Sequence, residues 1–237
     1  MSKLKRHDLT RGTSMTERIK SNRGNLKRSM EPELRLDIKP IYQGGEPTCG
    51  ICACSAVYRF FKIPTCGLKK RLGAGQPIIP QFRFPLRDMI SDYLKNTGTW
   101  ASSVCGVIWE DGFDYEITAD FNEFMGMMPM LLDMGYPSLV VVEGLSHWIV
   151  VAGIDDDKIC IVDSRYPKKK PSWKPIETFQ KSFNCAIMIT GHGIPRKPGA
   201  RDYIRNYLAG AKMVAIAAGK KMTITQGSLK IEKKKHC

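Results

Sequence analysis

A glycine-rich loop at residues 42–50 places a cysteine directly before a long apolar run. That run, residues 51–61, predicts a buried helix that ends before Pro64, so Cys49 would stand at a helix N-terminus. Unpaired backbone N–H groups and the positive end of the helix dipole favour a thiolate over a thiol there. Cys49 is therefore the candidate nucleophile.

Two residues that could serve such a nucleophile lie at the ends of neighbouring predicted strands. His147 opens one apolar strand and Asp163 closes the next, with three aspartates, 155–157, as the turn between them. In a hairpin, the start of the first strand lies beside the end of the second, so these two residues should meet. A carboxylate orients an imidazole, and the imidazolium supports a thiolate. Without Cys49, a histidine that only ends a strand would be the simpler interpretation.

Gln43 precedes Cys49 by six positions. Acyl transfer builds negative charge on a carbonyl oxygen, which hydrogen-bond donors stabilise when they are aimed at it. The side-chain amide of Gln43 and the backbone N–H of Cys49 could supply such donors. The spacing by itself fits an ordinary polar loop residue equally well.

The order of these motifs resembles that of the papain-like cysteine peptidases of the C39 and C39-like type, which include peptidase domains of bacteriocin-processing transporters. The motifs are Gln-x5-Cys-Gly at 43–50, Ser-His-Trp-Ile-Val-Val at 146–151 and Ile-Val-Asp at 161–163. The resemblance covers roughly residues 38–190. Two cysteines, Cys52 and Cys54, stand where the family usually has small residues.

The resemblance implies a role for each candidate residue. Cys49 would be the nucleophile, His147 the general base, Asp163 the residue that orients it and Gln43 the oxyanion donor. It also implies a papain-like α+β fold, in which an N-terminal helical lobe with the nucleophile helix packs on a C-terminal antiparallel sheet.

The predicted elements agree with the α+β class without that resemblance. The first half is mainly helical and includes a helix from Asp120, a good N-cap residue with Glu123 at capping-box spacing, to Met134. Apolar runs joined by tight turns then predict an antiparallel meander. The predicted strands are 113–118, 138–143, 146–154, 158–163 and 184–190.

Other stretches are less regular. Residues 64–85 are rich in proline and glycine and predict a long loop, and residues 86–95 predict a short amphipathic helix. Residues 100–112 fit no single pattern. Further helix is expected at 175–182 and in the small-residue stretch 200–218.

Basic charge is concentrated at the two ends of the 237-residue chain. The net charge is +14, of which residues 1–40 carry +6 and residues 196–237 carry +9. We predict a basic flexible extension at 1–37, the C39-like peptidase domain at 38–193, and a basic, partly helical extension at 194–237. Such ends can bind an anionic partner, either nucleic acid or an acidic membrane surface, or can be solvated, mobile termini.

The sequence predicts a cytoplasmic protein that needs neither cofactor nor metal. No apolar run is long enough to cross a membrane, and no apolar segment follows the basic N-terminus to make a signal peptide. The eight cysteines resemble small buried residues of a reducing compartment. A zinc site at residues 49–54 would lack a second pair of ligands.

Peptide-bond hydrolysis of a protein or peptide substrate is the function that these residues favour. The same three side chains could instead deamidate a protein glutamine or transfer an acyl group, since the acylation chemistry is shared. Cys49 and Cys52 also form a Cys-x-x-Cys pair, as in thiol–disulfide oxidoreductases, but a loop rather than a strand is predicted before them. A binding protein with a degenerate peptidase fold is disfavoured by the intact Cys, His and Asp.

Overall fold

The computed structural model describes the part of the chain that carries the candidate residues. It describes residues 34–44, 48–72, 99, 101–166, 170–197, 199, 202, 205, 208–209, 220–225 and 228–233. The predicted helix at 86–95 and most of the expected helical stretch at 200–218 lie outside these residues, as does most of the extension predicted at 1–37.

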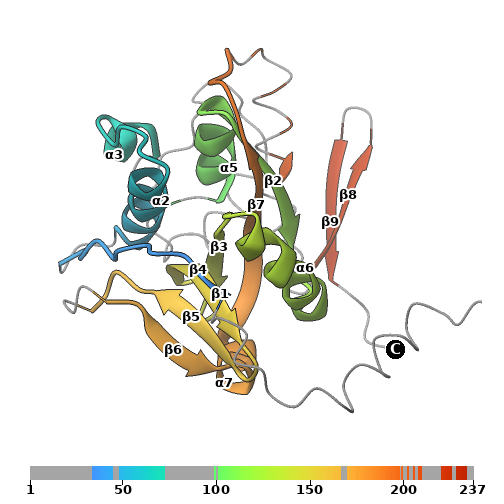
Figure 1. Ribbon diagram of the computed structural model, residues 1–237. Helices are drawn as coiled ribbons and strands as arrows, with labels where there is room; N and C mark the ends of the chain where they lie inside the picture. The colour runs from blue at the N-terminus through green and yellow to red at the C-terminus, as the bar shows by residue number, and fades with distance from the viewer. Residues whose placement is uncertain are drawn as a thin grey trace, which may run out of the picture. The chain divides into compact units, whose positions relative to one another are not determined.

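A single antiparallel sheet forms the centre of the fold (Figure 1). Within the described residues it has seven strands in the order β2-β7-β3-β4-β5-β6, and β1 pairs with β4. The strands are β1 (Leu34–Arg35), β2 (Phe113–Thr118), β3 (Ser138–Val142), β4 (His147–Asp155), β5 (Lys158–Val162), β6 (Ser172–Pro175) and β7 (Phe183–His192).

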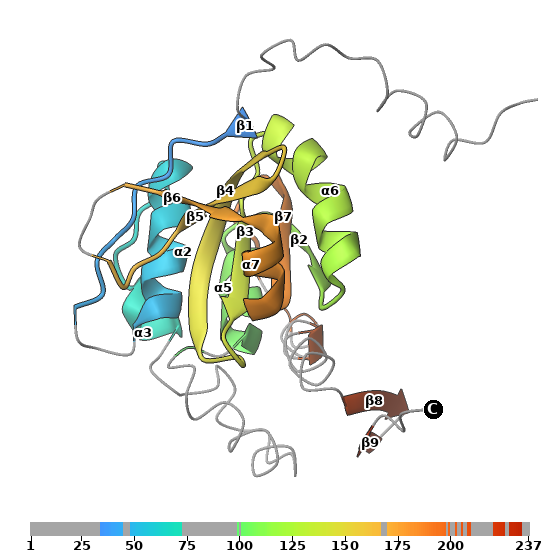
Figure 2. The same ribbon diagram turned by 90° about the horizontal axis from the view of Figure 1, so that it is seen from below.

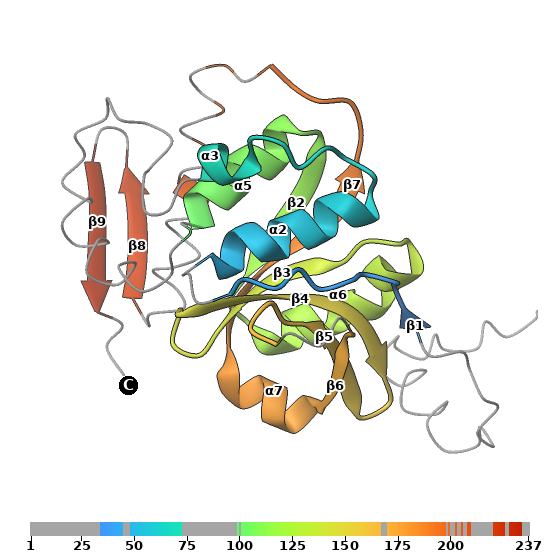
Figure 3. The same ribbon diagram turned by 90° about the vertical axis from the view of Figure 1, so that its left-hand side faces the viewer.

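Helices cover both faces of this sheet, as seen from two directions in Figures 2 and 3. One face is covered by α2, α3 and α5, and the other by α6 and α7. The helices are α2 (Cys49–Phe60), α3 (Leu68–Leu72), α5 (Ala101–Glu110), α6 (Phe121–Asp133) and α7 (Ile176–Ser182).

Strand β4 shows how the two cores are separated. Trp148, Val150 and Ala152 pack with α2 and α5, whereas Ile149 and Val151 point to the opposite face and pack with α6 and α7. Successive side chains of a strand alternate between faces, so a strand covered on both sides must be apolar throughout. This explains why β4 reads as one continuous hydrophobic run.

The α+β class predicted from sequence is confirmed, and most elements lie where they were expected. The stretch 64–85 is a partial exception, because it contains the helix α3. Leu68 and Leu72 of this helix are buried, and Arg71 hydrogen-bonds Glu110 and Asp111 on α5. These tertiary contacts hold a short helix between the flanking turns. Residues 101–110, where the pattern was ambiguous, form α5.

The strand order is more complex than the predicted meander. Strands β3 to β6 do follow one another, but β7 returns across the sheet and lies between β2 and β3. The sheet also reaches into the predicted extension at 1–37, because Leu34 and Arg35 pair with Ile154 and Gly153 of β4. A Cβ added to Gly153 would lie 2.9 Å from the carbonyl oxygen of Leu34, so only glycine permits this approach.

A second, two-stranded sheet occurs in the C-terminal region. Strand β8 (Lys220–Thr225) pairs with β9 (Ser228–Lys233) in antiparallel register. The sequence analysis did not predict this hairpin. No helix in the described ranges is long and apolar enough to cross a membrane.

The N-terminus of α6 offers a test of local stability. Asp120 accepts hydrogen bonds from the backbone N–H groups of Asn122 and Glu123, at 2.8 and 3.0 Å. Glu123 does not complete a capping box, because its carboxylate accepts a hydrogen bond from Thr118, whose hydroxyl oxygen accepts the Asp120 N–H.

We expect Asp120→Ala to lower the free energy of unfolding by about 1 kcal/mol, because two N–H groups lose their acceptor. Asp120→Asn, which keeps an acceptor oxygen, should remain close to the original chain. Urea unfolding of both variants measures the difference, and equal stabilities would contradict a capping role.

Candidate active site

Cys49 is the first residue of α2, in a position that requires a glycine next to it. The side chain of Thr99 lies against Gly50, and a Cβ added to Gly50 would lie 2.5 Å from the Thr99 Cβ. The backbone oxygen of Thr99 also accepts a hydrogen bond from the indole of Trp148, at 3.1 Å. The start of α2 is thereby packed closely against the start of β4, where His147 lies.

His147 and Asp163 meet at one edge of the sheet. His147 Nε2 lies 2.8 Å from Asp163 Oδ1, and the two side chains are only 5% and 2% exposed. Their strands, β4 and β5, pair antiparallel across the turn at 156–157. This is the juxtaposition that the hairpin argument predicted from the sequence.

Cys49 contacts the same histidine. Its side chain hydrogen-bonds His147, and the backbone N–H groups of Trp148 and Gly50 also bond the sulfur. Burial opposes ionisation of the thiol, but these hydrogen bonds and the positive charge of the ring outweigh it and lower the pKa of Cys49. The neighbouring Cys54 has no such partners, and burial raises the pKa of its thiol.

The charges of His147 and Asp163 support each other. Burial disfavours both charged forms, yet the hydrogen bonds to Asp163 and Cys49 raise the pKa of His147 to about 8. The pKa of Asp163 is held well below its usual range, because its bonds to His147 and Arg165 outweigh burial. An ionised Asp163 can only accept, so His147 Nε2 donates to it and Nδ1 is left to face the sulfur.

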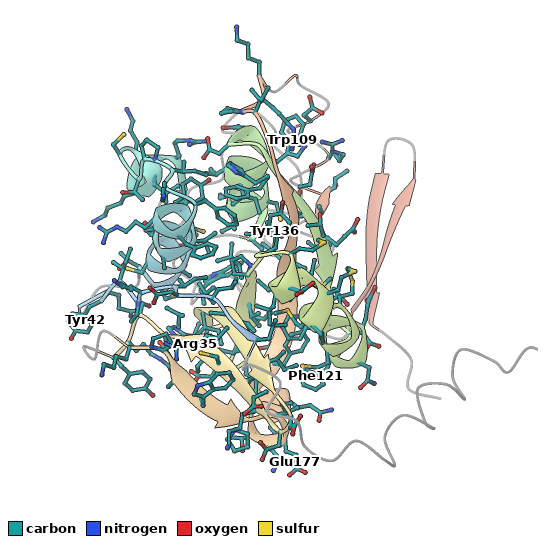
Figure 4. All side chains as sticks on the ribbon, in the orientation of Figure 1. Arg35, Tyr42, Trp109, Phe121, Tyr136 and Glu177 are labelled. Atoms are coloured by element: carbon teal, nitrogen blue, oxygen red, sulfur yellow. The ribbon has the colours of Figure 1, made fainter. Side chains whose placement is uncertain are left out.

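Gln43 is held by a residue next to Asp163. Its backbone N–H donates to the Ser164 carbonyl at 3.0 Å, and its side-chain Oε1 accepts from the Ser164 hydroxyl at 2.7 Å. The oxygen end of the amide is therefore occupied, and the Nε2 end is free to serve as a donor. Tyr42, the preceding residue, points into solvent (Figure 4) and is 56% exposed.

Sequence reasoning missed three residues that act on this site. Ser164 holds Gln43, Arg165 holds Asp163, and the backbone of Trp148 bonds the sulfur of Cys49. Each is a direct sequence neighbour of a candidate residue or lies two positions away. The positions alone carried no sign of these contacts, which depend on how the loop after β5 folds.

No cluster of three or more His, Cys, Asp or Glu residues that could hold a metal occurs in the described part of the chain. The seven cysteines that the structure describes are free thiols. The predicted anionic partner involves the basic ends, which lie mostly outside the described residues, and stays a prediction.

The chain is similar in structure to peptidase domains of the double-glycine type. One is a double glycine motif protease from an AMS/PCAT transporter in complex with the leader peptide, with 18% identity over 66% of this chain and 94% of the other, and a TM-score of 0.47. The peptidase domain of Streptococcus ComA, a bi-functional ABC transporter of a quorum-sensing pathway, shows 20% identity over 65% and 99%, with a TM-score of 0.42.

A third similar structure is the Streptococcus mutans ComA peptidase domain with a small-molecule inhibitor, with 24% identity over 40% of this chain and 76% of the other, and a TM-score of 0.33. No family model and no curated protein matches the chain. The sequence motifs had predicted a resemblance to peptidases of this type. At such identities and TM-scores the function has to be inferred from the residues of this chain.

The pKa shifts predict how the reactivity of Cys49 depends on pH. The pKa of Cys49 is lowered, so its thiolate forms below the pH at which an ordinary thiol ionises. The pKa of His147 is raised to about 8, so the charged ring persists up to that pH and is lost above it. The thiolate–imidazolium pair therefore exists between these two limits.

We expect iodoacetamide to alkylate Cys49 at pH 6 at least about tenfold faster than an ordinary thiol, of which only about 0.3% is ionised at that pH. Mass spectrometry of the labelled peptides measures the rate at each cysteine, with exposed Cys66 as the internal reference. His147→Ala should abolish the difference. Equal labelling of Cys49, Cys52 and Cys54 would contradict an activated thiolate.

Proposed function

We propose that this protein is a cysteine peptidase that cleaves a peptide bond through Cys49, His147 and Asp163. The observation that carries the proposal is the unbroken hydrogen-bonded series from the Cys49 sulfur through the His147 ring to the Asp163 carboxylate. This series starts at a helix N-terminus and includes a thiol with a lowered pKa, which is what nucleophilic catalysis requires.

In the proposed acylation step, the thiolate of Cys49 attacks the carbonyl carbon of the scissile bond. The His147 imidazolium gives its proton to the leaving amine, and a thioester remains on the sulfur. In the second step, water attacks the thioester and gives a proton to the neutral ring. The thiolate leaves, the acid product is released, and Asp163 keeps the ring oriented throughout.

Gln43 would stabilise the negative charge on the carbonyl oxygen in both steps. Its amide oxygen is bound by Ser164, which directs the two N–H bonds of Nε2 away from that contact. The backbone N–H of Cys49 would be the second donor. This role does not require Gln43 to touch the sulfur, only to reach the oxygen of a bound substrate.

The proposed substrate is a peptide or protein. Deamidation of a glutamine side chain and acyl transfer use the same first step and differ in the bond that breaks. A thiol–disulfide exchange role is disfavoured, because the described residues before Cys49, 36–44 and 48, form no strand and the sheet is antiparallel. Cytoplasmic location remains a prediction from the sequence.

The test is incubation of the full chain with a mixed library of synthetic peptides, some of which contain Gly-Gly, the motif named in one similar protein. Mass spectrometry should detect pairs of fragments whose summed mass exceeds that of the parent peptide by one water, about 18 Da. A gain of about 1 Da without fragmentation would identify deamidation instead, because an amide NH₂ is replaced by OH.

Two variants control this experiment. Cys49→Ala should release no fragments, whereas Cys52→Ser should cleave at close to the original rate, because only Cys49 bonds His147. Cleavage that survived Cys49→Ala would refute the proposal. Activity that failed in Cys52→Ser and survived His147→Ala would point to redox chemistry.

The oxyanion role of Gln43 predicts a separate pattern. Gln43→Ala should lower kcat for the cleaved peptide by ~10²–10³, the usual effect of losing one such donor, with little change in KM. Ser164→Ala should cause a smaller loss, because the amide remains but is no longer held.

Alkylation of Cys49 at pH 6 provides the control for that variant. Iodoacetamide reacts at a saturated carbon and forms no oxyanion, so Gln43→Ala should leave its rate unchanged. A parallel fall in alkylation would mean that Gln43 acts on the thiolate rather than on the carbonyl oxygen.

A further inference from the structure

Arg165 occupies the side of Asp163 that His147 leaves open. His147 bonds Asp163 Oδ1, and the backbone N–H of Arg165 shares that oxygen at 2.9 Å. The second oxygen, Oδ2, accepts from Arg165 Nε at 3.3 Å and Nη2 at 3.0 Å. The carboxylate is therefore bound on both oxygens, and its rotation would break at least one of these contacts.

The other edge of the same guanidinium binds Glu143. Arg165 Nη1 and Nη2 lie 2.6 and 2.8 Å from the two oxygens of Glu143, a bidentate pairing. Glu143 belongs to the turn between β3 and β4, four residues before His147. Arg165 thus connects the loop that carries Asp163 to the turn that leads into His147.

That turn has an unusual backbone. Glu143 and Leu145 have positive φ values of 58° and 72°, a conformation that costs a non-glycine residue free energy unless its surroundings stabilise it. The surroundings supply contacts: Glu143 N–H donates to the Ser182 carbonyl, and Leu145 N–H donates to the Asn184 side chain. The Arg165–Glu143 pair adds a third contact from the Asp163 side.

We propose that Arg165 is a positioning residue of the site, which fixes Asp163 toward His147 by bridging it to Glu143. This inference rests on the proposed function, since it assigns Arg165 a part in orienting the histidine of that reaction. Arg165 touches neither Cys49 nor the reacting atoms; it acts through Asp163.

Orientation and charge would act in opposite directions on His147. The groups that influence the ring are Asp163, Cys49, Arg165 and Glu143. As a charge, Arg165 disfavours the imidazolium, so its loss alone would raise the pKa of His147. As a clamp, it maintains the Asp163 hydrogen bond that raises this pKa, so its loss would lower it. The sign of the change separates the two roles.

The experiment compares three full-length variants: Arg165→Met, Arg165→Lys and Arg71→Met. Arg71 is the matched control, because it also bridges two carboxylates, those of Glu110 and Asp111, and is 37% exposed against 33% for Arg165. Proton NMR titration gives the pKa of His147, and iodoacetamide alkylation at pH 6 reports the Cys49 thiolate. Neither measurement needs a substrate, and thermal unfolding records stability.

For Arg165→Met we expect the pKa of His147 to fall from about 8 toward its ordinary value, and Cys49 alkylation at pH 6 to slow by about tenfold or more. Arg165→Lys should not restore either value, because one ammonium group cannot bridge both carboxylates in the same way. Arg71→Met should change thermal stability without changing either readout.

An unchanged or raised pKa of His147 in Arg165→Met would overturn the positioning role, as would full rescue by lysine. If the original chain itself alkylates at the rate of an ordinary thiol at pH 6, the proposed function fails first. A reactive original chain with unaffected Arg165 variants would leave the proposed function intact and refute only this inference.

Discussion

The buried hydrogen bond between His147 and Asp163 is the interaction on which the whole site depends. Burial of a charged ring or a carboxylate is costly unless the two are paired, and here each supplies the partner of the other. The bond also fixes which ring nitrogen carries the proton, so the remaining nitrogen is directed at Cys49. Without it, a buried histidine would lose its proton, and the thiol beside it would lose the charge that favours its ionised form.

The architecture serves this pairing by bringing a helix end and a hairpin end together. Antiparallel pairing of β4 and β5 brings the beginning of one strand beside the end of the other, and α2 packs on the sheet face to which Trp148 points. Close approach at Gly50 brings the start of this helix near the start of β4. The loop after β5 then carries Asp163, Ser164 and Arg165 in succession, so one short segment contacts the histidine, the candidate oxyanion donor and the turn before His147.

Much of the fold could be predicted, because its elements are long and strongly patterned. The apolar run of α2, the capped helix α6 and the strands from β3 to β7 were all expected within a few residues. The failures have physical causes. The helix α3 depends on burying Leu68 and Leu72 and on the pairing of Arg71 with α5, which local glycines and prolines do not reveal. The hairpin of β8 and β9 did have a local sign, the alternation of Met222, Ile224, Leu229 and Ile231 around a glycine-containing turn.

The sequence by itself determined the candidate nucleophile and the approach of His147 to Asp163, because helix ends and hairpins have fixed periods that residue spacing reveals. Tertiary structure alone decided the return of β7 to the middle of the sheet, which connects segments far apart in the chain. It also decided the partners of the site: Ser164 on Gln43, and Arg165 between Asp163 and Glu143. Such contacts depend on the path of an irregular loop and on side-chain conformations, for which the sequence has no periodic signal.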